Sequence, residues 1–190
     1  MDNQTEYYDQ VFNQSDIHFS LSGKTFEACK FKNCDLAEIS LSGAYFSDCS
    51  FVECNISLSD TLNTRFSDIC FSLCKISGLD FTKSNPFLLH IDFDDCLLSY
   101  CSFSSLKLDK SKFTSCKIDN CDFYSSSLVS ADFSSSTFAE TIFDNTDLSK
   151  ANFTDARGYS INPQTNKITK AIFSMPDVIN LLNPLDIIIK

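Results

Sequence analysis

The sequence has few of the residues that usually reverse the direction of a polypeptide chain. Its 190 residues include only four glycines and four prolines, and tryptophan is absent. Mixed globular domains place Gly and Pro at many of their turns. This chain must therefore turn by another device that is used repeatedly, although its apolar content of 43% is sufficient for a core.

Positive charge and long apolar runs are also scarce. The 25 acidic residues outnumber the 15 basic ones, which gives a formal net charge of −10. This balance argues against binding nucleic acid through a basic surface and favours a basic partner. The first ten residues lack the basic and apolar regions of a secretory signal, and no stretch approaches the roughly 18 apolar residues of a membrane span. We therefore expect a cytoplasmic protein.

Residues that commonly build active sites are sparse as well. The two histidines, His18 and His90, are far apart in the sequence, and the motifs HExxH, GxGxxG and GxSxG do not occur. The aspartates follow the outward positions of the repeat described next, whereas a catalytic carboxylate needs a concave, water-poor site. The sequence thus predicts no enzyme, with no catalytic residue, cofactor or metal site.

The large apolar residues that are present recur at every fifth position, a spacing that neither a helix nor an ordinary strand produces. Twelve such centres run from Phe26 to Phe81, and after a shift of two residues fourteen more run from Leu88 to Phe153. All 26 are Phe, Leu or Ile, except Thr61. The position two residues before each centre is usually small. Nine of the ten cysteines occupy it: Cys29, Cys34, Cys49, Cys54, Cys74, Cys96, Cys101, Cys116 and Cys121.

The cysteines could in principle be zinc ligands, disulfides or small buried residues. Cys34, Cys54 and Cys74 are spaced by 20 residues, which indicates that they stack above one another in successive coils. Stacked thiols that point the same way do not converge tetrahedrally on zinc. Parallel side chains also suit a disulfide poorly. We therefore predict that these nine cysteines are buried free thiols, and that only Cys70 lies outside their column.

Segments such as ADF (131–133) and ANF (151–153) show the repeated unit of a small residue, Asp or Asn, then Leu or Phe. The pattern resembles the pentapeptide-repeat family, whose consensus is A(D/N)LXX. The resemblance implies an all-β fold, a right-handed quadrilateral parallel β-helix, in which four pentapeptides make one square coil. It predicts an N-terminal cap over residues 1–25, the β-helix over 26–156, and a C-terminal cap and dimerisation segment with a short helix over 157–190.

The clearest departure from the repeat is a loop near residues 83–89. Asn85-Pro86 is a turn signal, and an interruption of a regular rod is a natural place for partner contact. A tolerated insertion without function is an equally weighted alternative. We expect Phe87 to project as an exposed anchor, while the apolar residue of 86–91 that faces inward stays ambiguous. The candidate partner-binding residues are Asp60, Asp80, Lys83, Ser84, Asn85, Pro86 and Phe87.

Two other segments stand out. Lys107, Lys110, Lys112 and Lys117 form a basic island in the sequence, for which a solvated patch is favoured over a nucleic-acid site. Near the C-terminus, where the last coil is expected to end at Arg157-Gly158, Ser174 is predicted to cap a helix that Asn183-Pro184 ends. The apolar residues of this tail must be buried, against the rod end or a second copy. The candidate dimer interface is Val178, Leu181, Leu182, Ile187 and Ile188.

The interrupting loop and the tail that begins ARGYSINPQTNKI resemble the topoisomerase-protecting branch of the family, the Qnr-type quinolone-resistance and microcin immunity proteins. This resemblance implies a homodimeric DNA-mimicking rod that binds DNA gyrase or topoisomerase IV and relieves poisoning by quinolones or peptide toxins. A net charge of −10 is sparse beside that of duplex DNA, so loop contacts gain weight. The alternatives are a generic interaction scaffold or effector with an unrelated partner, and an unrecognised enzyme.

Overall fold

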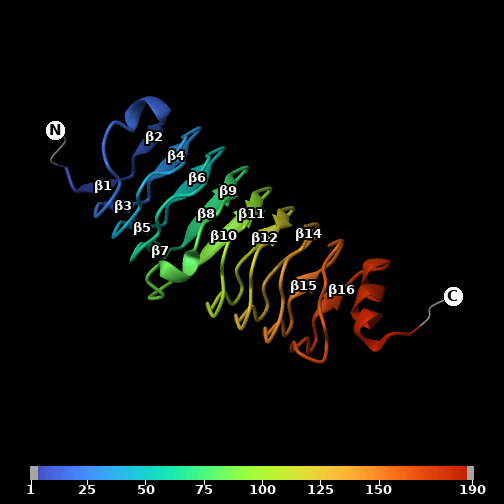
Figure 1. Cartoon of the computed structure of the whole chain (residues 1–190). Helices are drawn as coiled ribbons and strands as arrows, with labels where there is room; N and C mark the ends of the chain where they lie inside the picture. Colours follow the sequence, from blue (N-terminus) through green and yellow to red (C-terminus); the bar gives the residue numbers. More distant parts are fainter. Residues whose placement is uncertain (1–3, 188–190) are drawn as a thin grey trace.

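The computed structural model describes residues 4–187 and shows a rod that the chain builds in about eight coils, one after another along its length (Figure 1). Each coil has four sides. We name them face A to face D in the order in which the chain follows them, with Phe26, Phe31, Leu36 and Leu41 as the centres of one coil. The predicted right-handed quadrilateral β-helix is confirmed.

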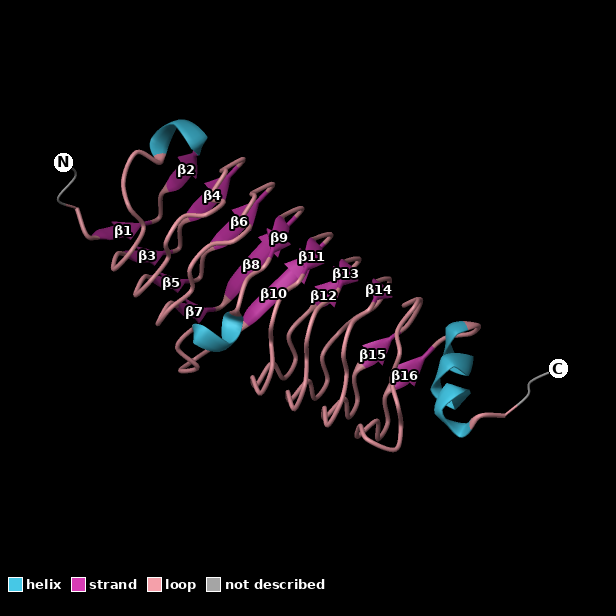
Figure 2. Ribbon diagram, in the orientation of Figure 1, coloured by secondary structure: helices cyan, strands magenta, loops and turns pink. Residues whose placement is uncertain are grey.

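The strands are short, and every pair of strands is parallel because each coil lies in register on the next (Figure 2). Face D has no strand of its own among the described residues and is held by isolated bridges such as Ser40 to Asp60. Face A carries β1 (Glu6–Tyr8), β3 (Thr25–Glu27), β5 (Tyr45–Ser47) and β7 (Arg65–Ser67). Face B carries β2 (Val11–Asn13), β4 (Lys30–Lys32), β6 (Ser50–Val52), β8 (Ile69–Ser72), β10 (Ile91–Asp94), β12 (Phe113–Thr114), β15 (Asn152–Phe153) and β16 (Ile172–Phe173). Face C carries β9 (Lys75–Ser77), β11 (Leu97–Ser99), β13 (Lys117–Asp119) and β14 (Thr137–Ala139).

A residue in the left-handed backbone region makes almost every corner. At one corner, Asn33, Glu53 and Leu73 lie in successive coils with φ of 51°, 55° and 56°. This conformation costs a residue other than glycine about 1–2 kcal/mol. In return, most corner amides donate a hydrogen bond to a carbonyl of the next coil, as Asn33 does to Val52 at 3.0 Å. This repeated corner is the turning device that the scarcity of Gly and Pro implies.

The centre residues fill the axis of the rod. Phe113, Phe123 and Phe133 are all fully buried. The ring of Phe113 stacks on that of Phe133 in the next coil at 5.0 Å and meets that of Phe123 edge-on at 5.5 Å. Burying each such ring contributes about 1.5–3 kcal/mol. Thr61, the exception among the centres, is also buried, and its hydroxyl donates to the carbonyl of Asp80 at 2.6 Å.

The thiols lie where the spacing predicts. All ten cysteines are free, nine are buried, and Cys70 alone is exposed. In the main column the amides of Cys34, Cys54 and Cys74 each donate to the sulfur one coil further on, at 3.4 Å. Burial raises the pKa of the Cys34 and Cys49 thiols to about 12. These thiols therefore stay protonated and unreactive at neutral pH.

The N-terminal residues already follow the winding of the rod. Strand β1 pairs with β3 and strand β2 with β4, which places Tyr7 against Phe26 and Phe12 against Phe31. The ring of Phe19, which is half-buried, stacks on that of Tyr7 at 5.2 Å. A short 3-10 helix, η1 (Gln14–Asp16), follows β2. The segment assigned to a cap thus contains a coil with a spacing of 19 residues, together with a ring that covers its end.

The other end of the rod extends further than expected. The last coil does not end near Arg157-Gly158, because Ile161 bridges to Phe143 and β16 pairs with β15. The ring of Phe173 stacks on that of Phe153 at 5.1 Å and continues the core. The sequence concealed this coil because its spacing departs from five, as described below.

The predicted C-terminal helix is present as the 3-10 helix η3 (Asp177–Leu185), but its expected boundaries are wrong. Ser174 does not cap it, because the Ser174 hydroxyl accepts a hydrogen bond from the Asp155 amide at 2.8 Å. Asp177 Oδ1 accepts another from the Gly158 amide at 2.9 Å. Pro184 lies inside the helix instead of ending it. Both side chains that resemble a cap fasten the tail to the preceding coils.

No helix within residues 4–187 combines the length and the apolar character that crossing a bilayer would require.

Candidate functional site

The interrupting loop is a two-residue insertion that leaves the rod continuous. Asn85 bridges to Arg65, while Ile91 pairs with Ile69, so five residues span a stretch that three span in the preceding coil. Asn85 Oδ1 accepts a hydrogen bond from the Phe87 amide at 2.9 Å, which closes a turn around Pro86. The thiol column passes the loop intact through the contact between Cys74 and Cys96.

The loop presents two apolar side chains to solvent. Phe87 is 68% exposed, as expected for an anchor, and the neighbouring Leu88 is 62% exposed. The assignment of Leu88 as a centre of the repeat is therefore wrong. Pro86 is also exposed, and the half-buried Leu89 packs against the core instead. That assignment placed the two added residues directly after Phe81. In the structure they follow Pro86, because Asn85 still lies 20 residues after its partner Arg65.

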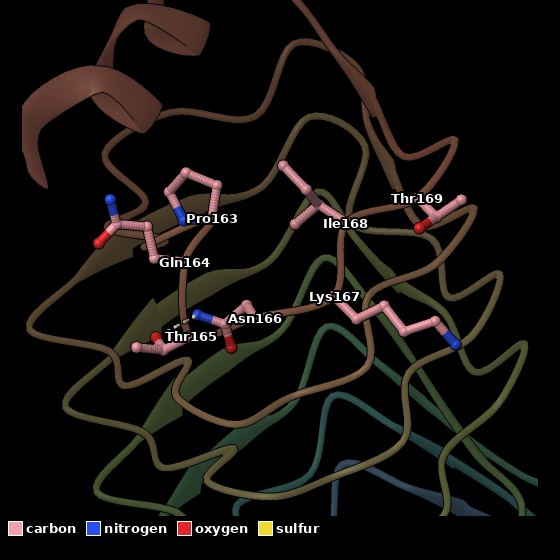
Figure 3. Close-up of a pocket in the computed structure, with 7 residues that line it drawn as sticks. All are labelled: Pro163, Gln164, Thr165, Asn166, Lys167, Ile168 and Thr169. Carbon is pink, nitrogen blue, oxygen red and sulfur yellow. Dashed lines mark hydrogen bonds between the residues drawn. The ribbon is translucent and has the colours of Figure 1, made fainter. Parts of the chain in front are cut away.

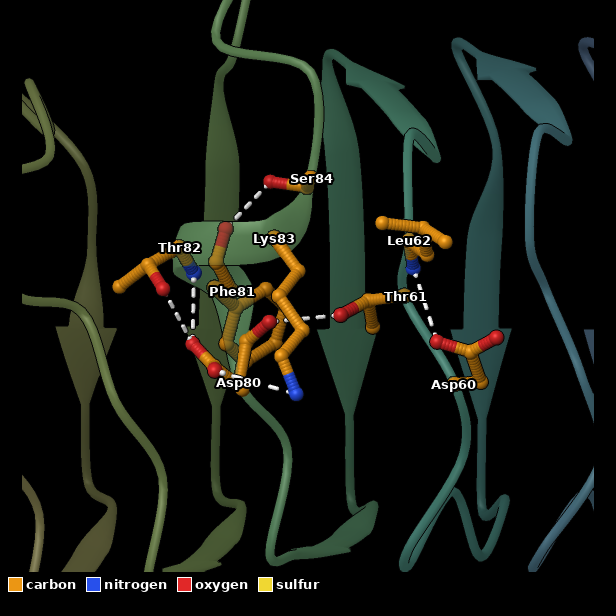
Figure 4. Close-up of polar contacts among 8 residues, drawn as sticks. All are labelled: Asp60, Thr61, Leu62, Asp80, Phe81, Thr82, Lys83 and Ser84. Atoms are coloured by element: carbon orange, nitrogen blue, oxygen red, sulfur yellow. Dashed lines mark hydrogen bonds and ion pairs between the residues drawn. The ribbon is translucent and has the colours of Figure 1, made fainter.

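The corner before the loop has a different structure from the others. Here the 3-10 helix η2 (Phe81–Lys83) replaces the left-handed residue (Figure 4). Asp80 Oδ1 accepts from the Thr82 amide at 3.1 Å, and Lys83 Nζ lies 3.5 Å from Asp80 Oδ2. Asp80 is therefore committed to holding this corner, and its charge is partly balanced by Lys83.

The seven candidate partner-binding residues do not share one face. Asp60 and Asp80 lie on face D, where they line a shallow hollow of about 230 Å³ with Lys83. Phe87 projects at the corner between faces A and B, on the far side of face A. Ser84, one of the candidates, is not available to a partner, because it is buried and its hydroxyl donates to the carbonyl of Phe81. A partner that contacts all the exposed candidates would have to cover face A.

One polar contact beside the loop was not predicted from the sequence. His90 Nδ1 lies 3.3 Å from Asp68 Oδ1, and the amide of His90 donates to the carbonyl of Phe66 at 3.2 Å. This pair holds the end of the loop against the preceding coil. The 22-residue separation of Asp68 and His90, which is one coil plus the insertion, could have indicated the contact.

The lysine island of the sequence is not a patch on the rod. The coil carries Lys107 to face A, Lys110 to the next corner, Lys112 to face B and Lys117 to face C. Lys107 Nζ lies 3.8 Å from Asp109 Oδ2, and Lys112 Nζ lies 4.0 Å from Asp92 Oδ2. Residues that are neighbours on this surface are about 20 apart in the sequence, so closeness in the sequence is misleading here.

A second interruption lies near the C-terminal end. Thr137 bridges to Arg157, which places Gly158 where a centre residue would stand, with φ of 73°. A Cβ atom at this position would lie 2.4 Å from the Phe138 carbonyl oxygen. The buried ring of Tyr159 fills the core in its place, 5.4 Å from that of Phe153. The chain then runs two residues short, since Phe143 bridges to Ile161.

The segment from Asn162 to Asn166 restores the register by adding two residues (Figure 3). Asn166 occupies the small column and is buried. Its Oδ1 accepts from the Thr146 amide at 2.9 Å, and its Nδ2 donates to the Phe143 carbonyl at 2.8 Å. The open hollow lined by residues 163–169 is the outer side of this turn. Because the polar atoms of Asn166 bond to backbone groups, we interpret this segment as structural: it returns the chain to the register of the preceding coil.

The candidate dimer residues divide into two groups. Val178 and Leu181 are half-buried, and Leu181 packs against the core of the rod. Leu182 and Ile187 are 38% and 54% exposed, while Ile188 lies outside the described residues. Sequence reasoning left out three further exposed apolar side chains of this end: Met175, Ile179 and Leu185.

The described residues offer little for catalysis. No group of three or more His, Cys, Asp or Glu side chains within residues 4–187 is placed to hold a metal ion. The carboxylates lie on the outside of a convex rod and not in the concave, water-poor site that catalysis by a carboxylate requires. What this surface can do is present side chains in fixed columns to another macromolecule.

Comparison with known protein families identifies the repeat. A model described as a pentapeptide repeat region matches residues 24–103, and a second, described as eight copies of pentapeptide repeats, matches residues 116–155. The chain belongs to the pentapeptide-repeat family. None of the curated proteins that were compared matches this pentapeptide-repeat protein.

Solved structures give a similar result. The pentapeptide-repeat rod is similar to two trypsin-treated variants of QnrB1, which is described as a plasmid-mediated fluoroquinolone resistance protein. For each the TM-score is 0.64, and the sequence identities are 17% and 16%. The alignments cover 98% of this chain and 98% and 99% of the QnrB1 chains. At these identities the similarity establishes the shared fold.

Proposed function

We propose that this rod binds DNA gyrase or topoisomerase IV and protects the enzyme from poisons such as quinolones or peptide toxins. The similarity to trypsin-treated QnrB1, a fluoroquinolone resistance protein, extends over 98% of this chain and supports the proposal. So does the acidic surface, which favours a basic, DNA-binding partner. The chain would act in the cytoplasm by binding alone, with no chemical step of its own.

The observation that carries the proposal is the projecting loop. A regular rod mostly offers polar side chains to solvent, and hot spots of binding are usually large side chains that become buried in a partner. Phe87 and Leu88 are exposed side by side on a turn that Asn85 closes. We propose that they enter an apolar pocket of the topoisomerase, with Lys83 and Asn85 at the rim.

Mimicry of DNA is a further part of the proposal and concerns face D. One column of this face reads Ser40, Asp60, Asp80, Ser102 and Asp122. With about 4.8 Å between coils, its charges are much sparser than the one per roughly 1.7 Å of duplex DNA. The charge of the rod would therefore steer the encounter, while the loop supplies most of the affinity.

A gyrase supercoiling assay tests the proposal. The protein at micromolar concentration should restore supercoiling in the presence of a fluoroquinolone and leave the drug-free reaction little changed. Replacing Phe87 and Leu88 with Ser should abolish the protection. Tyr100→Ser is a matched control, because Tyr100 is also 66% exposed but lies at the corner between faces C and D. An absence of protection with gyrase and topoisomerase IV alike would reject the function in favour of an unrelated partner.

We also propose that two copies associate through the C-terminal segment, where Leu182 and Ile187 remain exposed beside the half-buried Val178 and Leu181. Because Leu181 packs against the core, the test uses the outer pair. Leu182→Asp combined with Ile187→Asp should convert a dimer into a monomer in light scattering. Leu73→Asp, at an exposed corner far from the tail, should leave the dimer unchanged. A dimer that survives the double substitution would exclude this interface.

A further inference from the structure

The corner between faces A and B carries charges that reverse in sign along the rod. We call this corner the A–B ridge. Its residues, in coil order, are Asp9, Ala28, Asp48, Asp68, Leu88, Lys110, Ser130, Lys150 and Lys170. Three acids precede the loop and three lysines follow it, with Leu88 and the adjacent Phe87 between them. No cation stands among the first four residues and no acid among the last four.

The backbone places these residues above one another. All nine have φ between 51° and 67°. The amide of Asp48 donates to the carbonyl of Ser67 at 2.9 Å, immediately before Asp68 in the next coil. In the same way Lys110 donates to Val129, before Ser130, at 2.9 Å. Successive ridge residues are therefore about 4.8 Å apart along the rod.

The ridge is accessible and its charges are largely uncommitted. All six charged residues are exposed. Within residues 4–187, no carboxylate lies in ion-pair range of the lysines at 110, 150 and 170. Asp68 Oδ1 lies 3.3 Å from His90 Nδ1, and no lysine or arginine within residues 4–187 lies in ion-pair range of Asp68. A single rod thus leaves the charges of both halves of its ridge to be balanced by something outside itself.

A reversed copy of the same ridge is complementary to it at two of the four levels on each side of the loop, and at the other two, Asp48 with Ser130 and Ala28 with Lys150, no like charges meet. If two ridges meet antiparallel about a two-fold axis at the loop, residues at equal distances on opposite sides of the loop face each other. Asp68 then meets Lys110 of the other copy, one coil from the axis. Asp9 meets Lys170 in the same way, four coils from the axis. The two-fold repeats each pair, and the exposed Phe87 and Leu88 of the two copies meet at the centre.

We propose that the A–B ridge is an interface between two antiparallel copies of this chain. A parallel copy would place like charges against each other, and a uniformly charged partner such as nucleic acid would be repelled by one half of the ridge. An isologous contact of this kind is the commonest geometry of homodimers. Exposed ion pairs contribute little individually and are screened by salt. The association is therefore weak, salt-dependent and centred on the loop.

The pairing has a consequence for the loop. Phe87 and Leu88 are covered when two ridges meet, so a rod paired in this way cannot use them on another protein. Ridge pairing and loop-mediated binding of a partner therefore exclude each other.

Sedimentation equilibrium of the full chain tests the interface by charge exchange. The parent carries Leu182→Asp and Ile187→Asp, so that association through the tail is removed. At about 50 mM salt and high protein concentration it should form dimers, and at about 500 mM salt monomers. Asp68→Lys or Lys110→Asp alone should raise the dissociation constant roughly tenfold or more, because like charges then face each other. The double variant should restore the parental value.

Both substitutions are compatible with the backbone, since Asp and Lys already occupy left-handed positions in this column. His90→Gln is the matched control for the loss of the Asp68 contact, and it should leave association unchanged. A parent that stays monomeric at low salt would overturn the proposal. So would single variants that associate like the parent, or a double variant that stays as weak as the single ones.

Discussion

The repeat is interrupted twice, and the rod accommodates the two changes in spacing in opposite ways. Near Pro86 the chain gains two residues, which project outward as a loop and expose Phe87 and Leu88. Near Gly158 it loses two residues, regains them by Asn166, and turns polar groups inward. The first leaves the core almost unchanged and alters the surface, whereas the second alters the core. Function is therefore expected at the first interruption and stability at the second.

Alkaline pH should have the largest effect and should separate the two regions. All ten cysteines precede the second interruption, and the column of buried thiols runs past the first. The pKa of the Cys34 and Cys49 thiols is about 12 in the folded state, above the ordinary value of 9.0. The buried, protonated thiols therefore contribute fully to the free energy of unfolding below pH 9, and this contribution is lost as pH rises toward 12.

Limited proteolysis followed by mass spectrometry checks this expectation. With a reductant present, cleavage at pH 10.5 should begin within the coils from Cys29 to Cys121, while the coils from Leu128 to Phe173 stay protected longer. At neutral pH a thiol reagent should modify only Cys70, and all ten cysteines after unfolding. Equal sensitivity of both regions would remove this distinction between them.

Gly158→Ala should be the most damaging single substitution at the second interruption. It places a side chain at φ of 73° and 2.4 Å from a carbonyl oxygen of the backbone. We expect a loss of about 4 kcal/mol in the free energy of unfolding, measured by urea denaturation. Gly23→Ala is the control. Gly23 has φ of 67°, but a Cβ atom added there meets no neighbouring atom within 4 Å, so the substitution should cost about 1–2 kcal/mol. Equal losses would show that steric contact at 158 is unimportant.

Asn166→Ala should have the next largest effect. It leaves the Thr146 amide and the Phe143 carbonyl without the partners that Asn166 provides. Each buried group without a partner costs about 1–3 kcal/mol, so we expect a loss of about 3 kcal/mol in urea denaturation. Gln164→Ala, on the exposed side of the same turn, should be nearly neutral. A loss below about 1 kcal/mol for Asn166→Ala would mean that water replaces the amide.

Deleting Phe87 and Leu88 together should have the smallest effect on stability. It returns this coil to the 20-residue spacing of its predecessor and removes two exposed side chains. We expect the free energy of unfolding to stay within about 0.5 kcal/mol of the original. Protection of the topoisomerase should nevertheless disappear. A strongly destabilised deletion variant would show that the loop serves the fold.

The sequence predicted what depends on a strict period and missed what depends on a change of period. Phe113 and Phe133 could be placed in the core because their spacing repeats without interruption. Leu88 was misplaced because the spacing shows that two residues are added but not where. The final coil was missed because Gly158 and Pro163 stand at the expected centre positions, and the period returns only from Asn166 onward, with Ile168 and Phe173 as centres.

The surface was harder to predict than the core, since its neighbours are a whole coil apart in the sequence. Lys107, Lys110, Lys112 and Lys117 looked like one patch but are distributed around the rod. The lysines of the A–B ridge were not recognised as a group because 20 or more residues separate them. Ser84 is buried because it continues the column of small residues one coil after Thr64, and the uncertain place of the insertion concealed this.

The left-handed corners have an evolutionary consequence. Since Asn, Glu, Leu and Lys all occupy them without a glycine, the corners accept most side chains, and a ridge can change composition by single substitutions. Adding or removing one pentapeptide, by contrast, would rotate everything downstream by a quarter turn and scramble every column at once. Among changes in the number of repeats, only the gain or loss of four pentapeptides, one whole coil, keeps the columns aligned. Rods of this kind can therefore lengthen by duplication of whole coils while each side preserves its own chemical identity.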